Sequence, residues 1–192
     1  LSILCITSIA FSKFLAIHVE LRTQYLGVFP DPLFILEPID LSIPIFLIMY
    51  GSCLFFIIYN LKIPTQLITL IQSITLLLII RALTLFIFRF DAPEGMINLQ
   101  DPIMETFIYT KNLTTNQYNQ HDLFFSGHTA NLFLMTIILK KKKIKTLFIC
   151  LTILMGTLLV IQQAHYSIDV IFAPIFSLIA LFLHKKIKKF YS

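Results

Sequence analysis

Long apolar runs constrain this chain more than any other feature of its sequence. A run of about 20 apolar residues is what an α-helix needs to cross the hydrocarbon core of a membrane. Hydrophobic residues make up 57% of the 192 residues and charged ones 13%, whereas a soluble domain carries about 25% charged residues. Strands of a membrane barrel would alternate polar and apolar residues instead. The sequence therefore predicts an all-α polytopic membrane protein, with one helical-bundle domain over residues 1–192.

We expect six transmembrane helices and a long polar connection, residues 89–122. The expected spans are 1–19, 41–59, 64–88, a fourth from about Leu123 into the lysines at 140–145, then 144–163 and 167–184. The apolar part of the fourth span is short, so we expect its helix to continue through the lysines, whose side chains snorkel. Residues 26–41 are expected either to lie along the membrane interface or to form a plain loop.

Basic residues gather on one side of this topology. Ten of the fifteen Lys and Arg fall there: Lys62, Lys140, Lys141, Lys142, Lys143, Lys145, Lys185, Lys186, Lys188 and Lys189. By the positive-inside rule that side is cytoplasmic, so both termini are expected in the cytoplasm and the long connection outside. Because the lysines flank apolar spans, the net charge of +5 does not indicate nucleic acid as a partner.

The three cysteines carry no motif. Cys5, Cys53 and Cys150 each stand alone inside an apolar run. Single cysteines in such runs are expected to be buried, inert thiols, not metal ligands or redox groups.

His165 and Asp169 stand four residues apart at the start of the sixth expected span. If this segment is helical, the two side chains share a face and can form a hydrogen bond. A carboxylate on one imidazole nitrogen fixes the tautomer and leaves the other nitrogen as a lone-pair donor. The pair is then either a nucleophile or base with its orienting acid, or a structural pair that closes a tight turn.

The fourth expected span begins with the letters SGHT, residues 126–129. We expect Ser126 to cap the helix and Gly127 to let a ligand approach the backbone. The amides of a first helical turn are suited to bind a phosphate, and His128 beside them can donate a proton to a leaving oxygen. The alternative is an ordinary capped helix with a histidine at the interface.

Arg81 lies deep inside the third expected span, in the run LLIIRALTLFIF. An unpaired arginine in lipid costs at least a few kcal/mol, so we expect it to face the protein interior and to have a partner. Its guanidinium suits bidentate binding of a phosphate, and a structural carboxylate would satisfy it equally well. Arg89, at the outer end of the same span, is expected to anchor the interface.

Two histidines, an aspartate, an arginine and a helix N-terminus are thus expected on one membrane face. They suit phosphoryl transfer without a metal, in which neutral His165 attacks phosphorus and protonated His128 gives a proton to the departing alcohol. Asp169 would favour the charge that builds up on His165. The phosphohistidine would then pass its group to an acceptor.

Several motifs resemble those of a known family. The letters SGHT at 126–129, followed by HYSIDV at 165–170, resemble the PAP2 superfamily of lipid phosphatases and phosphotransferases. HDLFFSGHT at 121–129, IIRALTLFIFRFDAP at 79–93 and VFPDPLF at 28–34 are similar to motifs of its sphingomyelin synthase branch, with Asp122 at an acidic position of the first. Phe125 stands where the wider superfamily has proline and Leu159 where it has arginine, as in that branch.

The resemblance implies a phosphotransferase that moves phosphocholine or phosphoethanolamine from a phospholipid to ceramide or diacylglycerol. It implies His165 as the nucleophile, Asp169 as its orienting acid and His128 as the proton donor, with no metal or cofactor. The substrate-binding residues would be Arg81, Asp122, Ser126 and Gly127.

Two alternatives stay open. One is a lipid phosphate phosphatase or phospholipase C-type hydrolase, which would use the same site with water as the acceptor. The other is a non-catalytic membrane transporter or metal-binding protein, in which His128, His165 and Asp169 would hold a metal ion or a proton. The head group, the acceptor lipid and the oligomeric state are not fixed by the sequence.

Overall fold

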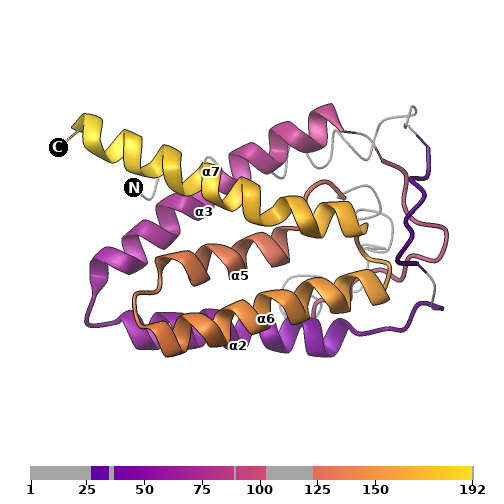
Figure 1. Ribbon diagram of the computed structural model, residues 1–192, viewed down its shortest axis with the longest axis horizontal. Helices are drawn as coiled ribbons and strands as arrows, with labels where there is room; N and C mark the ends of the chain where they lie inside the picture. Colours follow the sequence, from indigo (N-terminus) through magenta and orange to yellow (C-terminus); the bar gives the residue numbers. More distant parts are fainter. Residues whose placement is uncertain (1–26, 35–36, 89, 103–122, 192) are drawn as a thin grey trace, which may run out of the picture.

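The computed structural model of the chain describes residues 27–34, 37–88, 90–102 and 123–191 (Figure 1). Within these ranges the protein is all-helical. Its helices are α2 (Ser42–Asn60), α3 (Pro64–Ile87), α5 (Gly127–Ile138), α6 (Lys142–Ile161) and α7 (Ser167–Tyr191). Four of them, α2, α3, α6 and α7, are long and apolar enough to cross a membrane. These four agree with an integral membrane protein, and the expected span at 1–19 lies outside the described residues.

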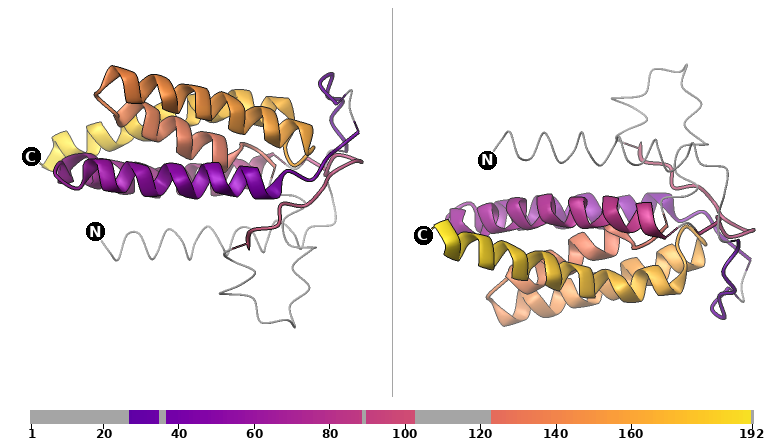
Figure 2. Two further views of the ribbon diagram at one scale, coloured as in Figure 1. Left: turned by 90° about the horizontal axis from the view of Figure 1, so that it is seen from below. Right: turned by 90° about the horizontal axis from the view of Figure 1, so that it is seen from above.

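The short helix α5 occupies the centre of the bundle. It contacts α2, α3, α6 and α7, with α2 and α6 on one side of it and α3 and α7 on the other (Figures 1 and 2). We call the end of the bundle where α2 and α7 begin the site end. The opposite end, which holds the α2–α3 turn, the α5–α6 link and the last turn of α7, is called the lysine end (Figure 1).

Local chemistry explains where the helices begin. The side chain of Asp40 accepts a hydrogen bond from the amide of Ser42 over 3.0 Å at the start of α2. Pro64 opens α3, where its missing amide is harmless and its fixed φ suits a helix. Ser126 caps α5 by accepting a hydrogen bond from the amide of Thr129. The cap expected at Ser126 is therefore present.

The expected continuation of the fourth helix through the lysines is wrong. Helix α5 ends at Ile138, Leu139 adopts an extended conformation, and α6 begins at Lys142. The physical reason is that consecutive lysines seek water, so the chain reverses direction among them. With 12 residues, α5 is about 18 Å long, well below the ~30 Å of a hydrocarbon core. It starts far short of the level at which α6 ends and α7 begins (Figure 1).

Helix α7 is longer than expected, because it continues past residue 184, the expected end of its span. It continues through the basic tail to Tyr191, because lysine is a good helix former and these side chains are exposed. Pro174 stands inside this helix and removes one intrahelical hydrogen bond there. Ser177, one turn later, donates from its hydroxyl to the carbonyl of Ala130 on α5 over 2.9 Å, which ties the two helices together.

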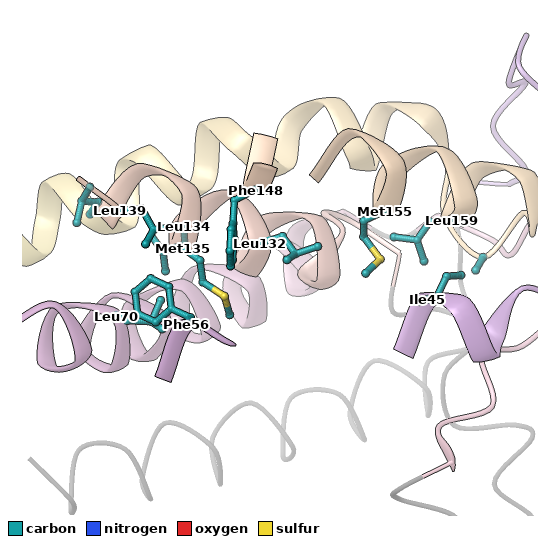
Figure 3. Packing of buried hydrophobic residues seen from close by; sticks show 12 residues of the cluster. Ile45, Phe56, Leu70, Leu132, Leu134, Met135, Leu139, Phe148, Met155 and Leu159 are labelled. Carbon is teal, nitrogen blue, oxygen red and sulfur yellow. The ribbon is translucent and has the colours of Figure 1, made fainter. Parts of the chain in front are cut away.

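The core lies where α5 meets its neighbours. Its main cluster is formed by large apolar side chains, shown in Figure 3: Ile45, Phe56, Leu70, Leu132, Leu134, Met135, Leu139, Phe148, Met155 and Leu159. A second cluster, between α3, α5 and α7, contains small residues such as Ala130 and Ala173. Gly156 permits close approach of α6 and α7, since a Cβ there would lie 2.5 Å from Cγ1 of Val170.

The outward faces of the long helices are apolar. Ile43 is 77% exposed, Leu47 72% and Ile153 66%, as expected for side chains that contact lipid. Cys150 is also exposed on α6 and Cys53 is partly buried, both as free thiols. The expectation of a buried thiol is therefore wrong for Cys150, because it lies on an outward face of its helix, and Cys5 lies outside the described residues.

Candidate active site

The segment Leu123–Ser126 folds into the protein before α5 begins. All four of its residues are buried, with exposures between 0 and 5%, and the peptide bond between Phe124 and Phe125 is cis. The amide of Ser126 donates to the carbonyl of Asp169 over 3.1 Å. The start of α5 is thereby joined to the first turn of α7 in the interior of the bundle.

Two residues of α3 hold this buried segment from the other side. The Nε of Arg81 donates to the carbonyl of Phe125 over 3.2 Å. The hydroxyl of Thr84 lies 3.2 Å from the carbonyl of Phe124 and 2.9 Å from that of Arg81. The expectation that Arg81 faces the interior and has a partner is confirmed, since the Phe125 carbonyl is one of its partners.

Gly127 allows the guanidinium to reach the first residue of α5. A Cβ at this position would lie 2.7 Å from Nη1 and 3.1 Å from Cζ of Arg81. A side chain here would push the guanidinium away from the helix N-terminus. The glycine therefore brings a fixed positive charge and the partial positive charge of the first turn to the same place.

His165 and Asp169 are paired, although not as two residues of one helix. His165 precedes α7, which begins at Ser167, and its Nδ1 lies 3.3 Å from Oδ2 of Asp169 and 3.1 Å from the carbonyl oxygen of Leu123. His165 is 3% exposed and Asp169 is fully buried. Both partners of Nδ1 are acceptors, so Nδ1 carries the proton of the neutral ring, and Nε2 keeps its lone pair.

Asp169 is itself fixed in place. Its Oδ2 also accepts a hydrogen bond from the amide of Tyr166 over 3.1 Å. Its Oδ1 is buried and has no hydrogen-bond partner among the described residues. A buried acceptor of this kind is costly, and it leaves capacity for a donor that arrives with a substrate.

His128 occupies the second residue of α5, next to Gly127. Its ring is partly buried and meets the ring of Phe46, on α2, edge to face at a centroid distance of 5.5 Å. One turn further along α5, Asn131 has a buried side-chain oxygen without a partner among the described residues. Sequence reasoning missed Asn131 and Phe46, because nothing in their residue types marks them.

Tyr166 connects the site to the loops above it. Its hydroxyl donates to the carbonyl of Asp91 over 2.8 Å and accepts from the amide of Phe29 over 3.2 Å, and its ring stacks on Phe34. Burial raises the pKa of this hydroxyl, so it stays protonated as a donor. The segment 27–34 therefore packs against the turn that carries His165.

The carboxylate of Asp31 reaches the first residue of α7. Its Oδ2 lies 2.5 Å from the amide nitrogen of Ser167, and its Oδ1 lies 2.9 Å from the Ser167 hydroxyl. Gln162 makes a similar connection on the α6 side, because its side chain accepts from the amide of Leu41 over 2.9 Å and donates to the hydroxyl of Ser42 over 3.1 Å. Neither residue had a role predicted from the sequence, although Asp31 lies within the VFPDPLF segment at 28–34.

A cavity of about 480 Å³ opens among the loops of the site end. It is lined by Val28, Phe29, Pro30, Asp31, Phe34, Glu37, Pro38, Pro93, Glu94, Gly95 and Gln163. The candidate catalytic residues His128, His165 and Asp169 are absent from this lining. The cavity and the buried histidine pair are therefore separate features of this end.

The structure thus connects Ser126, Gly127, Arg81, His165 and Asp169 through contacts and places His128 beside them on α5. Asp122 and Arg89 lie outside the described residues. No three His, Cys, Asp or Glu side chains cluster as metal ligands in the described part of the chain.

Comparison with known proteins gives one match. Residues 121–186 match the family model described as PAP2 superfamily C-terminal, which supports the PAP2 superfamily for the segment that carries both histidines and Asp169. The match suggests an enzyme of the lipid phosphatase and phosphotransferase type. No curated protein and no solved structure matches the chain.

Proposed function

We propose that this protein is a membrane-embedded, metal-independent phosphotransferase that moves a phospho-headgroup between lipids through a phosphohistidine at His165. The donor is a phospholipid with a phosphocholine or phosphoethanolamine head group, and the acceptor is ceramide or diacylglycerol. One observation carries the proposal: Nδ1 of His165 faces two acceptors, Asp169 and the Leu123 carbonyl. Nε2 is then the free nucleophile.

In the first step, Nε2 of His165 forms a bond to phosphorus while the bond from phosphorus to the diacylglycerol oxygen breaks. Protonated His128 gives its proton to that oxygen, so diacylglycerol leaves as a neutral alcohol. The imidazole of His165 becomes positively charged, and Asp169 at 3.3 Å stabilises that charge. The first turn of α5 and the guanidinium of Arg81 offset the negative charge on the phosphate oxygens.

In the second step, the hydroxyl of the acceptor lipid loses its proton to His128, which is now neutral. The acceptor oxygen attacks phosphorus and the P–N bond to His165 breaks. His165 returns to its neutral form and His128 to its protonated form, so the cycle closes without a cofactor.

Hydrolysis is the second candidate, and the family match favours it, since PAP2 superfamily members are generally phosphatases. Water would then replace the acceptor lipid in the second step. The non-catalytic transporter or metal-binding reading has less support, because the described side chains form no metal-ligating group.

We further propose that the site end faces away from the cytoplasm and the lysine end faces it. Lys62 lies in the α2–α3 turn, Lys140 and Lys141 lie in the α5–α6 link, and Lys142 and Lys143 open α6. Four more lysines lie near the end of α7: Lys185, Lys186, Lys188 and Lys189. The positive-inside rule assigns such an end to the cytoplasm.

The fate of the head group tests the function. Liposomes that contain the protein, ceramide and head-group-labelled phosphatidylcholine or phosphatidylethanolamine are compared with liposomes that contain labelled phosphatidate. We expect label to move onto ceramide. Label released to water identifies a hydrolase, and no turnover of any lipid by a folded preparation contradicts both enzyme proposals.

Two variants make the test specific. His165→Ala should abolish all turnover. His184→Ala removes an imidazole near the lysine end and should leave the rate of turnover unchanged. With a donor labelled at phosphorus, the wild-type protein should give an acid-labile phosphohistidine that is absent from His165→Ala. A labelled His165→Ala protein would exclude His165 as the nucleophile.

A further inference from the structure

We propose that Asp31 is a positioning residue that holds His165 and Asp169 in their reactive arrangement. This inference rests on the proposed function. Asp31 and Ser167 are 136 residues apart in the chain, and both carboxylate oxygens of Asp31 lie within hydrogen-bond distance of Ser167, one from its amide and one from its hydroxyl.

The position of Ser167 gives these two bonds their importance. It is the first residue of α7, two residues after His165 and two residues before Asp169. A carboxylate at a helix N-terminus satisfies an amide that has no intrahelical partner and complements the partial positive charge there. Asp31 therefore fixes the chain midway between the nucleophile and its orienting acid.

Asp31 is itself held by a rigid turn. Its Oδ1 also accepts from the amide of Leu33 over 3.0 Å, and its carbonyl accepts from the amide of Phe34 over 3.2 Å. Pro30 and Pro32 flank it, and the ring of each proline fixes one backbone dihedral. A turn with little freedom can transmit a fixed position to the residue that it contacts.

Asp31 does not touch the reacting atoms, so its effect must pass through the turn 165–169. That turn is tight: the amide of Tyr166 donates to Oδ2 of Asp169, and the amide of Asp169 donates to the carbonyl of Tyr166, each over 3.1 Å. A shift of Ser167 would therefore move Asp169 relative to Nδ1 of His165. A misplacement of about 1 Å can cost about 100-fold in rate.

The cavity above the turn supplies matched controls. Glu37 and Glu94 line it together with Asp31 and are exposed. Removal of either charge changes the electrostatics of the same loop cluster without removing the contact to Ser167. Glu94→Gln therefore separates the positioning effect from a general effect of negative charge.

The test measures kcat and KM for the whole chain in nanodiscs, with head-group-labelled phosphatidylcholine or phosphatidylethanolamine as the donor. Asp31→Ala should lower kcat by about 10- to 100-fold, slow phosphohistidine formation equally, and change KM little. Asp31→Asn should fall between Asp31→Ala and the wild-type protein, since its remaining carbonyl oxygen can accept one of the two hydrogen bonds. Glu94→Gln should match the wild-type protein.

A double variant tests whether Asp31 acts through Ser167. Ser167→Ala removes only the hydroxyl contact and should have a smaller effect than Asp31→Ala. The double variant Asp31→Ala/Ser167→Ala should be no slower than Asp31→Ala alone. Fully additive losses would overturn the proposed route.

Amide hydrogen exchange provides a readout that does not depend on activity. Exchange at residues 166–170 should be faster in Asp31→Asn than in the wild-type protein, while exchange at α5 should not change. If Asp31→Ala does not fold, kcat and hydrogen exchange are measured on Asp31→Asn and Ser167→Ala instead.

Wild-type kcat and wild-type exchange in these variants would overturn the proposal. A wild-type protein that turns over no lipid would contradict the proposed function, and hydrogen exchange would still test the contact.

Discussion

Ser126 and Asp169 are joined by a backbone hydrogen bond of 3.1 Å, from the amide of Ser126 to the carbonyl of Asp169. This bond connects the cap of α5 to the first turn of α7. The bond thereby fixes the position of the proposed phosphate-binding turn, at the start of α5, relative to the proposed nucleophile His165 and its partner Asp169. Substitutions in either half are expected to act on the other.

Replacement of Asp169 by asparagine should remove the negative charge of this side chain and keep its size and shape. An amide can still accept the hydrogen bond from the amide of Tyr166, which Oδ2 now accepts over 3.1 Å, but it cannot stabilise a charged imidazole. We expect kcat to fall by about 10²- to 10⁴-fold, with the helical circular dichroism spectrum unchanged. A variant with wild-type kcat would show that Asp169 has only a structural role.

Gly127→Ala should weaken phosphate binding through Arg81. The new Cβ would lie 2.7 Å from Nη1, and the guanidinium is the flexible end of its side chain, so it should move and leave the fold intact. Loss of one charge-assisted hydrogen bond is worth about 1.5–3 kcal/mol, so KM for the donor lipid should rise about 10- to 100-fold.

Gly51→Ala is the control for that substitution. Gly51 lies in α2, and a Cβ there would meet nothing within 4 Å. We expect unchanged KM and a slightly higher melting temperature, because alanine is the better helix former. Equal KM values for the two glycine variants would contradict the role given to Gly127.

Ser126→Ala should destabilise the protein by about 1 kcal/mol, the usual cost of losing a helix cap. The variant removes the acceptor for the amide of Thr129 and the contact to the Thr129 hydroxyl at 3.1 Å. Thermal unfolding in nanodiscs measures the loss. Thr146→Ala, which alters an exposed hydroxyl on α6, should change the melting temperature less.

Removal of divalent metals should leave activity unchanged. The proposed chemistry uses two histidines, Asp169 and Arg81, and the described residues hold no cluster of metal ligands. Activity is compared before and after treatment with a chelator. Loss of activity that added metal restores would support the metal-binding alternative.

The sequence predicted the long helices well because each is a solid apolar run. The expected spans 41–59, 64–88 and 144–163 correspond to α2, α3 and α6 with shifts of at most two residues. The fourth helix begins at Gly127 and not near Leu123, and two further errors concern lysines. Consecutive lysines end α5 at Ile138, yet lysines in the tail extend α7 to Tyr191. Residue type alone does not distinguish a reversal of the chain from an exposed helical turn.

The candidate site was predictable where side-chain chemistry marks it, at His128, His165, Asp169, Arg81 and Ser126. Its supports were not. The carbonyls of Leu123 and Phe125 are contacts that any residue can provide. The contact from Asp31 to Ser167 spans 136 residues, and no local periodicity reports such a distance.

The shortness of α5 has an energetic consequence for lipids. Its first turn lies inside the bundle, further from the site end than the last turn of α6 and the first turn of α7 (Figure 1). Drawing a lipid out of a bilayer costs about 0.8 kcal/mol for each methylene group exposed to water, which is prohibitive for two acyl chains. In the proposed function, a recessed phosphate site would let both lipids react with their chains still solvated by the membrane, so that cost would not arise.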